Sequence, residues 1–170
     1  MNLDQYIRDV KDHPKKGIVF KDITPLLKHA DSLNYAANAL VELVKNKKID
    51  KVVGMESRGF LFAPIIAREL KAGFVPVRKK GKLPSAVISQ TYSLEYGTDV
   101  LEIHVDSITK GDKVLIHDDV LATGGTAEAV CKLVEKLGGE IVQCNFLIEL
   151  DFLEGNKKLK GYPVSSLLHY

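Results

Sequence analysis

Two adjacent acids and a glycine- and threonine-rich turn stand out in the second half of the chain. The segment VLIHDDVLATGGT, residues 114–126, is an apolar run that ends at Asp118 and Asp119, passes into a small turn and leads into a predicted helix at 127–137. Backbone N–H groups of residues 123–126 at a helix N-terminus, with the threonine hydroxyls, could donate to a terminal phosphate. The two carboxylates could accept hydrogen bonds from vicinal sugar hydroxyls. A plain strand–turn–helix corner with a threonine cap explains the glycines and threonines but not the acids, so the pattern favours a ribose phosphate.

Other phosphate-binding motifs fit the sequence less well. The sequence contains no G-x-G-x-x-G. Gly54 and Gly59 have the glycine spacing of a Walker loop, but Phe60 and Leu61 follow where lysine and serine or threonine are required.

Length, charge and cysteine content restrict the class of protein. The 170 residues are expected to form one domain with a self-sufficient core, and a net charge of +2 is too small to favour nucleic acid as a ligand. Cys131 and Cys144 match no metal or disulfide pattern and are expected to be buried packing residues. With neither a secretory leader nor a run of eighteen apolar residues, we expect a cytoplasmic protein without membrane contact.

Apolar periodicity predicts helices and strands that alternate along the chain. The apolar positions of residues 3–10 predict a short leading helix, followed after Pro14 by an extended stretch at 18–20. Asp31 or Ser32 is expected to cap a second helix that ends near Lys48. Further elements are predicted as strands at 51–55, 74–77, 101–105, 140–150 and 164–168, and as a helix at 60–70.

This alternation favours an α/β fold with a central, mostly parallel sheet flanked by helices, in which ligands bind at the carboxyl ends of the strands. The polar stretch between Arg78 and Asp99 shows little periodicity and is predicted to be a long loop. Loops of that length in compact domains are usually lids or disordered, so we expect high mobility at about 80–98. His117, just before the acids, is expected to be a packing residue.

The acids and the following A-T-G-G-T resemble the sugar-phosphate signature of type I phosphoribosyltransferases, which bind 5-phosphoribosyl 1-diphosphate (PRPP). Further segments, in the same order, resemble the adenine phosphoribosyltransferases of that family. They are GIVFKDITPLL at 17–27, GMESRGF at 54–60, RKKGKLP at 78–84, YSLEYG at 92–97 and the terminal SSLLHY.

The resemblance implies a type I phosphoribosyltransferase fold. It would comprise a single domain over residues 1–170, a small N-terminal hood at about 1–30 completed by the C-terminal segment, and a flexible lid at about 80–98. It implies transfer of the 5-phosphoribosyl group from PRPP to N9 of adenine, giving AMP and diphosphate in purine salvage. The implied PRPP- and AMP-binding residues are Asp118, Asp119, Ala122, Thr123, Gly124, Gly125 and Thr126.

An adenine pocket needs a flat apolar sandwich and donor–acceptor groups that match the base. The resemblance implies that Phe20 stacks on adenine, that Leu150 covers its other face, and that backbone groups of Val19 and Lys21 read its polar edge. From the residue alone, Phe20 could equally be a core aromatic of the hood.

A departing diphosphate requires nearby cations, because negative charge builds up on the leaving group. Amides of the turn at Glu56 and Ser57 could also face a phosphate, and the resemblance implies a cis peptide between these two residues. Mg²⁺ is expected to bind through the substrate and water, without a direct protein ligand. The cation candidates are Arg58, Arg78, Lys79 and Lys82. In relatives Arg78 reaches across a homodimer interface, which implies a dimeric catalytic unit; a surface basic cluster is the alternative.

The lid carries the implied catalytic residue. Glu95, flanked by Tyr92 and Tyr96, resembles the family's catalytic glutamate and could move a proton at N9 directly or act through a hydrogen bond at N7. An ordinary solvated glutamate is the alternative.

Two other functions remain open at this point. The same reaction could use another base, such as hypoxanthine, guanine, xanthine or orotate, although the hood and lid segments favour adenine. The chain could also be a non-catalytic PRPP sensor of the purine-repressor kind. Only about twenty residues precede the hood segment at Val19, Phe20 and Lys21, which is too few for a winged-helix module, and an electropositive flank is missing.

Overall fold

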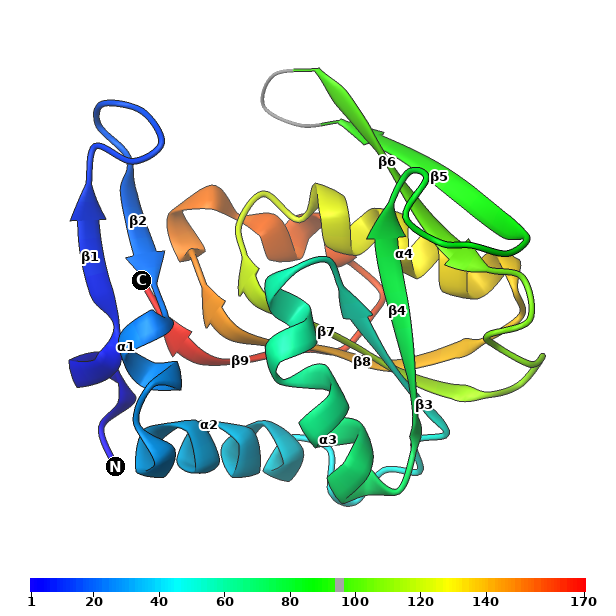
Figure 1. Ribbon diagram of the computed structural model, residues 1–170, viewed down its shortest axis with the longest axis horizontal. Coiled ribbons are helices and arrows are strands. Elements are labelled where there is room, and N and C mark those ends of the chain that lie inside the picture. Colours follow the sequence, from blue (N-terminus) through cyan, green and yellow to red (C-terminus); the bar gives the residue numbers. More distant parts are fainter. Residues whose placement is uncertain (94–96) are drawn as a thin grey trace. The chain divides into compact units, whose positions relative to one another are not determined.

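The computed structural model describes residues 1–93 and 97–170 (Figure 1). Within it the chain forms two compact units, Met1–Ala39 and Leu40–Tyr170. None of the helices described is both long enough and apolar enough to cross a membrane. The expected catalytic residue Glu95 and its neighbour Tyr96 lie outside the described residues.

The first unit is built around a two-stranded antiparallel ribbon. A 3₁₀ turn, η1 (Leu3–Tyr6), precedes β1 (Arg8–Lys11), which pairs with β2 (Val19–Asp22). At one end of the ribbon, the guanidinium Nε of Arg8 donates to the Asp22 carboxylate at 3.0 Å, directly across the two strands. The chain then forms the short helix α1 (Thr24–Leu27) and enters α2 (Ala30–Glu42).

Two expectations for this region are wrong in detail. The leading helix predicted over 3–10 is only a 3₁₀ turn followed by β1, because cross-strand pairing with β2 outweighs the local apolar spacing. The second helix starts at Ala30 and ends at Glu42, so it begins before the predicted caps and stops short of Lys48. Ser32 does not cap it; its hydroxyl donates to the carbonyls of Leu26 at 2.7 Å and His29 at 3.1 Å.

The second unit contains a seven-stranded sheet in the order β5-β6-β4-β3-β7-β8-β9. Strands β4, β3, β7, β8 and β9 run parallel, whereas β5 and β6 form an antiparallel hairpin at one edge. The mostly parallel α/β sheet predicted from the sequence is therefore confirmed. The strand bounds are β3 (Lys51–Met55), β4 (Gly73–Lys79), β5 (Val87–Ser93), β6 (Thr98–His104), β7 (Lys113–Leu121), β8 (Glu140–Glu149) and β9 (Val164–His169).

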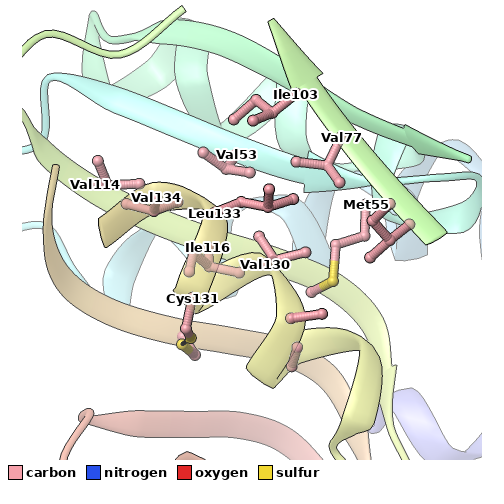
Figure 2. Packing of buried hydrophobic residues seen from close by; sticks show 14 of the residues in the cluster. Val53, Met55, Val77, Ile103, Val114, Ile116, Val130, Cys131, Leu133 and Val134 are labelled. Carbon is pink, nitrogen blue, oxygen red and sulfur yellow. Dashed lines mark hydrogen bonds between the residues drawn. The ribbon is translucent and has the colours of Figure 1, made fainter. Parts of the chain in front are cut away.

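Two helices cover the two faces of this sheet. A methyl group added to Gly54 of β3 would lie 2.8 Å from Cβ of Ala63 in α3 (Ala63–Leu70), so this side of β3 faces α3. The neighbouring Val53 and Met55 pack instead in one cluster with Val130 and other residues of α4 (Gly125–Lys136), as Figure 2 shows. Because successive residues of a strand point to opposite faces, α3 and α4 lie on opposite sides of the sheet.

The strand order reverses between β3 and β7. From β3 the chain crosses through α3 to its neighbour β4, and from β7 it crosses through α4 to β8 on the other side. In open α/β sheets such a reversal leaves a crevice at the carboxyl ends of the two central strands. The residues that follow β3 are Glu56 to Arg58, and the end of β7 carries Asp118 and Asp119.

Two elements around the crevice differ from the predictions. The long loop predicted between Arg78 and Asp99 contains β5, whose residues 87–93 pair with β6 over its whole length. Ile88 and Tyr92 lie on the same face of β5 and pack against the core cluster. The alternation expected of a strand was not recognised because most of the other residues of β5 are polar. Strand β7 also does not end at the two acids but continues to Leu121.

The packing residues predicted from the sequence are confirmed. Cys131 and Cys144 are both fully buried, with their sulfurs 3.8 Å apart. His117 is fully buried, and its Nδ1 lies 2.8 Å from the amide oxygen of Asn145. Burial lowers the pKa of His117 to about 4, so the ring is neutral at pH 7 and does not act as an acid there.

A close backbone contact holds the turn after β7. This turn, residues 122–126, is called the phosphate loop below; it packs against Gly155, the first residue of η4 (Gly155–Leu159), which follows η3 (Asp151–Leu153). A methyl group added to Gly155 would lie 2.1 Å from the carbonyl oxygen of Ala122 and 3.0 Å from the amide nitrogen of Gly124. Because these are backbone atoms, no side-chain rotation could make room for the methyl group.

We therefore expect Gly155→Ala to lower the free energy of unfolding by about 1–3 kcal/mol, as overpacked positions do. Urea unfolding followed by circular dichroism measures this. Gly73→Ala is the matched control, because the only tight contact of its added methyl group would be with the flexible side chain of Lys51, at 3.2 Å, while the Asp50 carbonyl oxygen at 3.8 Å is at ordinary contact distance. It should change stability by less than about 1 kcal/mol. Wild-type stability of Gly155→Ala would contradict the close contact.

Candidate functional site

The phosphate loop presents the unpaired amides that begin α4. Gly124 adopts a positive φ of 78°, which turns the chain from β7 into α4. No side chain in the described part of the molecule caps this helix end. The first N–H groups of a helix lack partners within the helix, so those of α4 remain available to an anion.

A small pocket of about 80 Å³ lies at this helix end. Its size and its amide-rich wall suit a phosphate group rather than a large ligand. The residues that line it include six of the seven predicted for PRPP, namely Asp118, Ala122, Thr123, Gly124, Gly125 and Thr126.

A larger cleft of about 480 Å³ opens at the switch point between β3 and β7. Asp118 lines both this cleft and the small pocket, so the two spaces share this residue in their walls. The cleft gathers three cations and four oxygen-bearing side chains from segments far apart in the sequence. They are Arg58, Lys79 and Lys82, with Glu56, Ser57, Asp118 and Asp119.

The two adjacent acids have different surroundings. Asp119 is almost fully buried and forms an ion pair with the Nε of Arg58, which is itself about half exposed. Asp118 accepts a hydrogen bond from the backbone N–H of Asp119 at 2.9 Å. Burial, and then the charge of Asp119, raise the pKa of Asp118 well above its ordinary value. Asp118 therefore takes up a proton more readily than an ordinary aspartate does.

Glu56 binds cations rather than a phosphate. Its carboxylate accepts hydrogen bonds from Arg78 Nε at 3.2 Å, from Arg78 Nη2 at 3.3 Å and from the backbone N–H of Lys79 at 2.8 Å. Burial raises the pKa of Glu56, but these hydrogen bonds and the charges of Arg78 and Lys82 lower it below its ordinary value. The residue predicted to lie near the diphosphate thus lines the cleft and fixes the end of β4.

The turn after β3 has the predicted backbone geometry. The peptide between Glu56 and Ser57 is cis, as expected. The turn continues into the 3₁₀ helix η2 (Arg58–Leu61), where Gly59 lies against β7. A methyl group added to Gly59 would lie 3.0 Å from both the Asp118 carboxylate and the His117 carbonyl oxygen. Glycine at this position lets the turn approach the acids closely.

Arg78 is the predicted diphosphate residue that does not line the cleft in the single chain. Its guanidinium is occupied by Glu56 and lies 3.5 Å from the carbonyl oxygen of Lys82. The predicted role across a dimer interface stays a prediction.

The residues predicted for adenine lie in both compact units. Val19, Phe20 and Lys21 follow one another on β2 of the first unit, and the ring of Phe20 makes an edge-to-face contact with His13 at a centroid distance of 5.2 Å. Leu150 directly follows β8 in the second unit, and its N–H donates to Leu121 at the end of β7 at 2.9 Å. The pocket that would combine them stays a prediction.

Of the predicted lid residues, Tyr92 is described. Its hydroxyl donates to the Asp99 carboxylate at 3.4 Å, and the partly buried ring packs against the core cluster. Glu95 and Tyr96 fall outside the described residues, so the catalytic assignment stays a prediction.

Three residues of the site were missed in the sequence. Gly59 and Gly155 shape it through close backbone contacts, and Asp99 pairs with Lys79 at 3.3 Å. Only Gly59 had a visible signal, because it belongs to the GMESRGF segment.

Comparison with known proteins agrees with this geometry. The family model described as the phosphoribosyl transferase domain matches residues 21–167. A protein of Flavobacterium johnsoniae named adenine phosphoribosyltransferase is 64% identical over 170 residues, which is the full length of both chains.

Solved structures agree as well. The crystal structure of adenine phosphoribosyltransferase from Rhodothermus marinus is 56% identical, covers 99% of this chain and 96% of its own, and superimposes with a TM-score of 0.94. The Saccharomyces cerevisiae enzyme, solved with adenine and an imino-altritol bisphosphate, is 44% identical over 98% of this chain and 96% of its own, with a TM-score of 0.93. The fold, the paired pocket and cleft, and the full-length identity together show that the chain belongs to the adenine phosphoribosyltransferase family.

Proposed function

We propose that this chain transfers the 5-phosphoribosyl group from PRPP to N9 of adenine, giving AMP and diphosphate. The observation that carries the proposal is the position of Asp118, which lines both the small pocket at the phosphate loop and the cation-rich cleft. A ribose at this carboxylate would have its 5-phosphate in the pocket and its diphosphate in the cleft. In the reaction the bond from C1′ to N9 forms, the bond from C1′ to the diphosphate oxygen breaks, and the proton of N9 leaves.

In this reaction the amides of residues 123–126 hold the 5-phosphate, and Asp118 and Asp119 accept hydrogen bonds from the ribose hydroxyls. Arg58, Lys79 and Lys82 surround the departing diphosphate, where negative charge increases as the bond breaks. Fixed cations are effective here because they need no reorganisation in the transition state.

We also propose that Mg²⁺ enters with the substrate and is bound by its diphosphate, its ribose hydroxyls and water. The carboxylates of the cleft support this, because Asp119 is paired with Arg58 and Glu56 with Arg78 and Lys79. Neither acid is free to supply a dedicated oxygen cage, and Mg²⁺ readily keeps several waters. When bound, the ion neutralises charge on the leaving diphosphate.

For the base we propose the roles that the resemblance implies for each residue: Phe20 stacks on adenine, Leu150 covers a face of the base, and backbone groups of Val19 and Lys21 read its polar edge. This hood, about residues 1–30 with the C-terminal segment, and the lid at about 80–98 complete one phosphoribosyltransferase domain. The reduced, buried pair Cys131 and Cys144 fits a cytoplasmic location, where thiols remain reduced. Recovery of the protein in the soluble cytoplasmic fraction of cells would check the location.

Diphosphate release tests the reaction directly. With PRPP and Mg²⁺ present, we expect adenine to be converted at least about a hundredfold faster than hypoxanthine, guanine or orotate, because a pocket with matched donors and acceptors rejects bases that leave them unpaired. Chelation of the metal should abolish turnover, and added Mg²⁺ should restore it. Preference for another base would refute the adenine assignment, and the absence of turnover with every base would refute the enzyme assignment.

We propose that Glu95 is the catalytic residue that moves the proton. Because general acid–base help is typically 10²–10⁴-fold, Glu95→Gln should lower kcat by about that factor while the affinity for PRPP changes less than about threefold. Glu69→Gln, at an exposed glutamate of α3, is the matched control and should keep the wild-type kcat. A loss below threefold in Glu95→Gln would remove this residue from the mechanism.

We further propose that the catalytic unit is a homodimer in which Arg78 acts in the neighbouring site. Gel filtration should then show a dimer, and Arg78→Ala and Asp118→Asn should each be nearly inactive alone. Mixed and refolded together, they should recover about a quarter of the wild-type activity, because half of the dimers are mixed and each has one intact site. A fully active monomer, or no recovery on mixing, would contradict action across the interface and favour the contact of Arg78 with Glu56 of its own chain.

A further inference from the structure

Asp99 joins three strands at the edge of the cleft. It lies near the start of β6, opposite Tyr92 of β5 in the antiparallel ladder. One carboxylate oxygen, Oδ2, lies 3.3 Å from Nζ of Lys79 at the end of β4 and accepts the Tyr92 hydroxyl at 3.4 Å. The other oxygen, Oδ1, accepts the backbone N–H of Val100 at 2.8 Å. The side chain of Asp99 is therefore fixed in place from two directions before it meets Lys79.

Lys79 is the flexible partner in this arrangement. Its side chain is about half exposed and lines the cleft, whereas that of Asp99 is mostly buried and does not. A free lysine side chain samples many rotamers, and binding an anion requires one of them. The contact with Asp99 selects the rotamer that keeps the ammonium at the cleft, and it raises the pKa of Lys79, so the charge is retained.

Tyr92 connects the same carboxylate to the phosphate loop. Tyr92 lines a cavity of about 190 Å³ together with Gly125 of the loop and residues of α4. Burial and the charge of Asp99 raise the pKa of Tyr92 above its ordinary value. A hydrogen bond with the Thr126 side chain lowers this pKa, but by less. Tyr92 therefore holds the Asp99 carboxylate against the body of the second unit.

We propose that Asp99 is a positioning residue that orients Lys79 toward the diphosphate of the substrate. Asp99 itself does not line the cleft, so it would act through Lys79 alone. The inference rests on the proposed function for the identity of the ligand. It concerns the diphosphate half of the substrate and leaves the ribose 5-phosphate half unaffected.

A double-mutant cycle with Asp99→Asn and Lys79→Ala tests this. Because the pair is partly exposed, Asp99→Asn should raise the KM for PRPP about three- to fivefold, with kcat changed less than twofold. The dissociation constant of diphosphate, measured by calorimetry with Mg²⁺, should rise by a similar factor, and that of AMP should not change. In the Lys79→Ala background, Asp99→Asn should change either constant by less than about 1.5-fold.

Asp106→Asn is the matched control, since this acid is exposed on the turn that follows β6. It should behave as the wild type. Equal effects of Asp99→Asn in both backgrounds, a parallel loss of AMP affinity, or no effect on diphosphate would each overturn the proposal. If the wild type forms no AMP, the proposed function fails, whereas the diphosphate titrations still decide whether Asp99 acts through Lys79.

Discussion

Contact between backbones at two glycines is the constraint on which the site depends. Gly59 lets the turn after β3 lie against Asp118, and Gly155 lets the η3–η4 segment lie against Ala122 and Gly124 of the phosphate loop. At Gly155 an added carbon would not fit without a backbone shift, and at Gly59 it would lie 3.0 Å from both Asp118 and the His117 carbonyl oxygen, so its neighbours would have to move slightly. Because a packed interior transmits such shifts instead of absorbing them, the small pocket and the cleft keep their spacing only while both contacts remain. A substrate that spans the two spaces needs that spacing to be constant.

Ion pairs complete the site by fixing its cations before a ligand arrives. Arg58 is held by Asp119, Arg78 by Glu56, and Lys79 by Asp99, and in each pair the acid is more buried than the base. The acids therefore act as rigid anchors, and the more exposed basic groups extend from them. Cations held in this way are already oriented, so less side-chain conformational entropy is lost when a multiply charged anion binds.

Much of this arrangement was predictable from the sequence, and the failures have physical causes. The parallel strands and α4 were found because their apolar periodicity and their Gly-rich turns agree with the final packing. Strand β5 was missed because it lies at the sheet edge, where Ile88 and Tyr92 alone carry the buried face. The predicted leading helix was wrong because residues of β1 pair with residues of β2 that lie 8 to 14 positions away in the sequence, outside the local pattern. Gly155 and Asp99 have no local signal, since their importance comes from atoms that only folding brings near.

The different surroundings of the two signature acids could not be predicted from the sequence either. Asp118 and Asp119 are identical and adjacent, and a motif describes them as a pair. In the fold, Asp119 is buried and paired with the Arg58 guanidinium. Asp118 lines both spaces, and its pKa is raised by burial and by the charge of Asp119. In the proposed reaction both acids accept hydrogen bonds from the ribose hydroxyls, but only Asp119 also orients Arg58, so two identical residues of one motif have different roles.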